Sequence, residues 1–101
     1  MFKRLDPLIF VGKKFNLKSI GVDDYQVEIV GHRAGRIFKL ARAERKFVWF
    51  WTITGPVCAE AGLISRGDCP SLIEARQLFR QNFDRWLNWA SSLHESAGWH
   101  E

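Results

Sequence analysis

Residues 47–54 read FVWFWTIT and are followed at once by Gly55 and Pro56. Successive side chains of a strand point to opposite faces, so these aromatic residues cannot all enter one core. Alternation groups the bulkier set on one face, and we expect that set to be buried: Phe47, Trp49, Trp51 and Ile53. Val48 and Phe50 then point to the opposite, outer face. That face is either covered by another segment or left open for a partner.

The residues before this stretch predict two more strands joined by short turns. In YQVEIVG (25–31), apolar and polar residues alternate with the period of a half-buried strand. A glycine-bounded turn follows, in which we expect Gly35 to supply the positive φ of a tight hairpin. RIFKLAR (36–42) is the second predicted strand. Connections this short imply an antiparallel meander over residues 25–54.

A long helix is predicted to follow the meander. SLIE (71–74) has the pattern of a capping box, in which the Ser71 hydroxyl accepts the backbone N–H of Glu74. Apolar residues then recur at steps of three and four and form a wide stripe: Leu72, Ala75, Phe79, Phe83, Trp86, Ala90 and Leu93. The expected fold class is therefore α+β, with a three-stranded antiparallel meander packed on one long C-terminal helix, residues 71–93.

A chain of 101 residues with 47% hydrophobic and 14% aromatic residues is enough for one globular domain and too short for two. We expect an irregular segment at 1–24, with short strands possible at 8–11 and 15–20, and a frayed tail at 94–101. Residues 57–70 are predicted to be a loop with a short extended piece. The N-terminal segment is one candidate cover for the outer face through its apolar side chains: Leu8, Ile9, Phe10 and Phe15.

Several of these motifs together resemble a group of small uncharacterised alphaproteobacterial proteins. They are Y-x-V-x-I-x-G (25–31), G-R-I (35–37), W-F-W-T-I-T (49–54) and a helix opening with E-A (74–75). The resemblance implies the same fold and no particular activity, and the loop AGLISRGDCPS (61–71) departs from it. The meander is also similar, at the level of fold, to the three-stranded DNA-binding domains of the integrase arm-binding kind, and fold alone does not imply function.

Basic residues are concentrated in the first half of the chain. Residues 1–46 contain eleven Lys or Arg and five Asp or Glu, whereas residues 47–101 contain four and six, and the net charge is +4. A basic hairpin is one candidate for nucleic-acid binding: Arg33, Arg36, Lys39, Arg42, Arg45 and Lys46. Alternation places Lys39 on the face opposite to Arg36 and Arg42, however, and such residues commonly protect sheet edges from aggregation.

The sequence offers little for catalysis, cofactors or metals. No histidine or cysteine has the spacing of a zinc site. Cys69 precedes the predicted helix start, where a thiol pKa can fall, but the sequence places no general base beside it. Cys58 and Cys69 could form a disulfide, although free thiols are expected in the cytoplasmic location that we predict. Arg66-Gly67-Asp68 is expected to be a turn rather than an adhesion motif.

The leading hypothesis is a small non-enzymatic interaction module that binds a protein or a second copy of itself. It would act through the outer sheet face and the edge strand, without a cofactor, a metal, a membrane or a small-molecule substrate. We expect its contacts to come from five residues: Val30, Lys39, Arg42, Val48 and Phe50. Nucleic-acid binding through the basic hairpin at 33–46 is the alternative.

Overall fold

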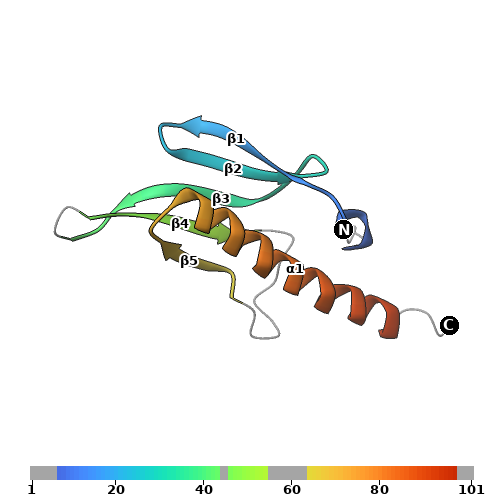
Figure 1. The fold of residues 1–101 in the computed structure, drawn as a ribbon. Coiled ribbons are helices and arrows are strands. Elements are labelled where there is room, and N and C mark those ends of the chain that lie inside the picture. Colours follow the sequence, from blue (N-terminus) through green and yellow to red (C-terminus); the bar gives the residue numbers. More distant parts are fainter. Residues whose placement is uncertain (1–6, 44–45, 55–63, 98–101) are drawn as a thin grey trace.

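The computed structural model describes residues 7–43, 46–54 and 64–97. A short 3-10 helix, η1 (Pro7–Phe10), is followed by five strands and one long helix, α1 (Leu72–Ala97). The strands are β1 (Phe15–Gly21), β2 (Asp24–Ile29), β3 (His32–Ala41), β4 (Phe47–Ile53) and β5 (Arg66–Cys69). They form one antiparallel sheet in the order β1-β2-β3-β4-β5, with α1 lying across one face (Figure 1).

The predicted α+β class, with an antiparallel sheet and one C-terminal helix, is confirmed, but the prediction of three strands is wrong. β1 was not recognised as part of the sheet because most of its residues are exposed and it ends at a glycine, Gly21. β5 consists of Arg-Gly-Asp-Cys, a composition typical of a turn. It forms a strand because Gly67 lies opposite Trp51 and leaves room for the indole, whose nearest atoms would be 3.2 Å from a Cβ at this position.

The start of α1 follows the predicted cap. The Ser71 Oγ accepts a hydrogen bond from the backbone N–H of Glu74 at 3.1 Å. Glu74 also places a carboxylate in the first turn, where the helix dipole favours negative charge. The predicted stripe is buried at Ala75, Phe79 and Phe83, and in this way α1 packs against β3, β4 and β5.

The N-terminal segment belongs to the helix side of the sheet. Phe10 is fully buried, with ring centroids 6.0 Å from Phe83 and 6.4 Å from Trp86. Phe15 packs edge-on against Phe79 at 5.2 Å and Phe83 at 5.0 Å. Phe10 and Phe15 were candidate covers of the outer face, but they lie on the opposite face, where both complete the core beneath α1.

The aromatic strand is only partly core. Trp51 and Ile53 are buried as expected. Trp49 is half-buried and stacks on Tyr25, with ring centroids 6.4 Å apart. Phe47 has the same orientation but is 59% exposed, so its predicted burial is wrong. The cause is visible in Figure 1, where the β3–β4 hairpin extends beyond the first turn of α1 and loses its cover.

The turn between β2 and β3 is shorter than predicted. It consists of Val30 and Gly31, with φ of 50° and 75°, and His32 already begins β3. Two successive residues with positive φ are the signature of a type I′ hairpin turn, whose twist matches that of the strands. Gly35 was expected to supply the positive φ of this turn, but it lies inside β3 and that prediction is wrong.

Candidate interaction surface

The outer face of the sheet, opposite α1, has an apolar strip at its centre. Phe38 and Leu40 of β3 lie opposite Phe50 and Val48 of β4. The two phenylalanine ring centroids are 5.4 Å apart, and all four side chains are half-buried. We call these four residues the outer strip. Among the described residues, the elements outside the sheet are η1 and α1, which pack on each other and on the opposite face.

The two phenylalanines of the outer strip lie within a row of four residues that crosses four strands. From β2 to β5, directly opposed residues on this face are Asp24, Phe38, Phe50 and Asp68. Carboxylates therefore stand at both ends of the row, and two aromatic rings stand between them. Directly opposed side chains on one face of an antiparallel sheet are close enough to form a single continuous surface.

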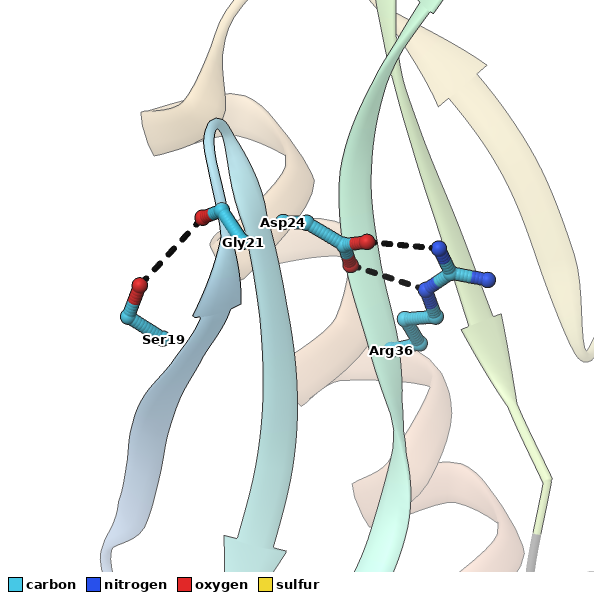
Figure 2. A network of polar contacts seen from close by, with 4 residues as sticks. All are labelled: Ser19, Gly21, Asp24 and Arg36. Carbon is cyan, nitrogen blue, oxygen red and sulfur yellow. Dashed lines mark hydrogen bonds and ion pairs between the residues drawn. The ribbon is translucent and has the colours of Figure 1, made fainter.

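Each of these carboxylates is paired with an arginine. Arg36 donates from Nε to Asp24 Oδ1 at 2.8 Å and from Nη2 to Oδ2 at 2.6 Å, while its Cζ lies 4.2 Å from the Phe38 ring centroid. The two bonds, and nearby Ser19 donating from Oγ to the Gly21 carbonyl at 3.3 Å, are drawn in Figure 2. Hydrogen bonding to Arg36 lowers the pKa of Asp24, against a smaller opposing effect of burial.

At the other end of the row, Arg42 Nη2 donates to Asp68 Oδ2 at 2.7 Å. Both side chains are nearly half exposed, so water screens this pair more than the one at Asp24. Asp68 belongs to Arg66-Gly67-Asp68, which was predicted to be a turn. The tripeptide is instead most of β5, because its backbone completes the ladder of β4.

The five predicted contact residues are only partly brought together. Val48 and Phe50 belong to the outer strip, and Arg42 lies beside it through its pair with Asp68. Lys39 is on the helix-side face, where its Nζ lies 5.0 Å from the Phe47 ring centroid. Val30 is in the β2–β3 turn rather than on a strand face, as its φ of 50° shows.

Four residues of this surface were missed from the sequence: Asp24, Phe38, Leu40 and Asp68. The sequence could have revealed Phe38 and Leu40. Together with Arg36 and Arg42 they recur at every second position, so all four lie on the same face of the strand. An antiparallel hairpin then requires them to face Val48 and Phe50. Residues 47–54 were expected to be the last strand of a three-stranded meander and therefore an edge strand. That prediction is wrong, because β4 is internal and the edges of the sheet are β1 and β5.

The basic hairpin does not present one uniform positive surface. Arg33, opposite Glu28 in the register, shares the outer face with Arg36 and Arg42, whereas Lys39 lies on the helix side. Three of these cations have carboxylate neighbours. Arg36 and Arg42 form the pairs described above, and Lys39 Nζ lies 4.0 Å from an Asp23 oxygen. The two remaining predicted residues are Arg45 and Lys46. The first lies outside the described residues, and the second is exposed.

The candidate nucleophile of the sequence, Cys69, lies just before the start of α1. Cys69 is a free, buried thiol that donates to the carbonyls of Trp49 at 3.6 Å and Ser71 at 3.4 Å. Burial raises the pKa of this thiol, the opposite of what a nucleophile requires. Cys58 lies outside the described residues. Within the ranges that the structure describes, no three His, Cys, Asp or Glu residues gather as metal ligands.

The described part of the chain has no helix that is both long enough and apolar enough to cross a membrane. Searches of protein-family models, of curated proteins and of solved structures found no match to this chain.

Proposed function

We propose that this protein is a non-enzymatic interaction module, and that its outer strip pairs with the outer strip of a second copy. The observation that carries the proposal is the position of four apolar side chains at the centre of a sheet face that no described element covers. A solvated face of an antiparallel sheet ordinarily alternates to polar residues. Here the polar residues flank the strip instead, as in the rim of a protein interface.

The charge pattern favours a second copy over an unrelated partner. A two-fold interface requires a surface that is complementary to itself. The row Asp24–Phe38–Phe50–Asp68 meets this requirement, because its ends carry the same charge and each has an arginine beside it. When two copies meet with the rows reversed, each phenylalanine pair faces the other, and the arginine of one copy can reach the carboxylate of the other.

The experiment is the molecular mass of the wild-type protein and of Phe50→Asp in solution, by light scattering and analytical ultracentrifugation over a range of micromolar concentrations. The new carboxylate would be desolvated in the centre of the interface, so we expect the wild type to dimerise and the variant to remain monomeric. Val22→Asp is the matched control, since it adds the same charge at a site that is 93% exposed in the β1–β2 turn.

Circular dichroism is the check that both variants keep the fold, which we expect because Phe50 is half-buried and contributes little to the core. A wild type that is monomeric at all concentrations would refute pairing through the strip. A Phe50→Asp variant that still dimerises would place the interface elsewhere on the molecule.

Nucleic-acid binding remains the second candidate, and one observation favours it: Arg33, Arg36 and Arg42 lie on the same sheet face. The ion pairs of Arg36 and Arg42 weaken this case, because their carboxylate partners oppose contact with phosphate. Fluorescence anisotropy with labelled duplex DNA at low and physiological salt separates the two functions. Affinity that falls steeply with salt and is lost in Arg33→Glu/Arg42→Glu would favour nucleic acid.

A further inference from the structure

On the helix side of the sheet, an open groove of about 620 Å³ lies between β1 and the first turns of α1. Its floor is apolar. The half-buried Phe15 and Leu17 are backed by buried Val27, Ile37 and Phe79, and the exposed Ile73 lines the helix side. The groove is on the opposite face from the outer strip and is independent of the function proposed above. Its volume is within the range of about 300–1,000 Å³ that is usual for small-molecule sites.

The walls of the groove are basic and contain no carboxylate among the lining residues. Lys14 stands on the β1 side, while Arg76 and Arg80 project from α1. Gln77 and Gln81 add neutral hydrogen-bonding groups on the helix. A pocket with an apolar floor and walls of one charge sign attracts ligands of the opposite sign and concentrates them.

The cations of the walls differ in how firmly they are held. Arg80 donates from Nε to Asp84 at 3.2 Å and from Nη1 to the Lys13 carbonyl at 2.8 Å, and its Cζ lies 4.7 Å from the Phe15 ring centroid. It therefore ties the helix to the start of β1 and forms a fixed wall. The side chains of Lys14 and Arg76 are exposed and form no ion pair or hydrogen bond with other residues in the described ranges.

We propose that this groove binds an amphipathic organic anion, an apolar chain with a terminal carboxylate or phosphate. The chain would lie against Leu17 and Ile73, and the anionic group would meet Lys14 and Arg76. The carboxylate that neutralises part of the charge, Asp84, is held by Arg80 and does not line the groove. The basic walls of the groove should therefore disfavour binding of cationic amphiphiles of the same chain length.

The test is a titration of the isotopically labelled full chain with decanoate, followed by amide chemical shifts. Decyltrimethylammonium and decyl phosphate are titrated in parallel, all below the concentration at which they form micelles. We expect decanoate to shift amides of β1 and of the first two turns of α1, with decyl phosphate acting at the same site and the cation producing no such shifts.

The decisive variant is Lys14→Ala/Arg76→Ala, and its matched control is Lys18→Ala/Arg85→Ala. The control removes two exposed cations that do not line the groove, so both variants have the same net charge. We expect decanoate affinity to fall about tenfold in the first variant and to stay unchanged in the control.

Three results would overturn the proposal. One is the absence of any saturable shift with decanoate or decyl phosphate. Another is an equal response to the cationic amphiphile, which would indicate unspecific adsorption of an apolar chain. The third is an equal loss of affinity in the control, which would attribute binding to the net positive charge. Shifts confined to β3 and β4 on the outer face would likewise assign the ligand to a different surface.

Discussion

The ring of Phe79 lies against the backbone of Gly35, so closely that a Cβ at position 35 would approach its Cε2 to 2.6 Å. The same Cβ would collide with the Thr52 carbonyl oxygen of the neighbouring strand. Gly35 is buried, and Phe79 is 1% exposed and central to the core. The glycine of the G-R-I motif therefore serves close packing of α1 on β3, rather than a left-handed backbone conformation.

Gly35→Ala should consequently destabilise the protein by about 3 kcal/mol or more, since neither the Thr52 carbonyl nor the Phe79 ring can move without disturbing the sheet or the core. The measurement is the free energy of unfolding from chemical denaturation. Gly31→Ala is the control: its φ is 75° with open space around it, so it should cost about 1 kcal/mol through backbone strain alone. A larger loss at position 31 than at position 35 would contradict the packing argument.

Val30 carries strain that a different turn residue would remove. A β-branched residue at φ of 50° is unfavourable, and Val30 is 47% exposed, so it gains little from burial. Val30→Asn creates the Asn-Gly pair that type I′ turns prefer, and should raise the free energy of unfolding by about 1 kcal/mol.

Val22→Asn is the matched control for this change, since Val22 is exposed in the β1–β2 hairpin turn and its φ is not positive. It should leave stability within about 0.5 kcal/mol of the wild type. No gain at position 30, or an equal gain at both positions, would show that the backbone at Val30 is not the source of strain.

The Asp24–Arg36 pair should make stability depend on pH. The folded pKa of Asp24 is below its ordinary value of 3.8, so its contribution is present above that pH and is lost as pH falls through the folded pKa. Asp24→Asn should cost about 1 kcal/mol at neutral pH, a modest figure because Arg36 is 39% exposed.

Denaturation of the wild type and Asp24→Asn across the acidic range measures this effect. The difference in unfolding free energy should begin to shrink below pH ~4, where the unfolded carboxyl group binds a proton, and should vanish as pH falls through the lowered folded pKa of Asp24. Asp68→Asn provides the comparison, and should cost less because its pair with Arg42 is more exposed. A difference at Asp24 that persists unchanged into strong acid would exclude the ion pair as its cause.

The parts of the fold that were predictable are those whose local pattern agrees with their tertiary environment. Alternation identified residues 25–29 and 47–53 as strands, and the Ser71 cap with its apolar stripe identified α1. β5 could not be found in this way. Four residues with a glycine and two charges become a strand only because β4 offers an unpaired edge and Trp51 needs space above Gly67.

The candidate surface was likewise predictable only where the local sequence pattern was sufficient. The alternation of side chains along one strand was enough to place Val48 and Phe50 on the outer face. Alternation does not reveal which residues of neighbouring strands lie beside them. Those neighbours depend on the register between strands, which shifts at the bulge after Val27 in the β2–β3 pairing. The pairs that flank the strip join residues 12 and 26 positions apart in the chain, and no local pattern specifies them.

The buried thiol of Cys69 should be unreactive in the folded protein. It is 7% exposed, it is held by two backbone carbonyls, and burial raises its pKa, so thiolate is scarce at mildly alkaline pH. In a Cys58→Ser background, modification by a thiol-specific disulfide reagent should be slow in buffer and should accelerate with denaturant in parallel with the loss of circular dichroism. Cys69→Ala in the same background corrects for reagent hydrolysis. Rapid modification without loss of structure would mean that the thiol is accessible to reagents in the folded protein. Cys69 would then again be a candidate nucleophile beside the start of α1.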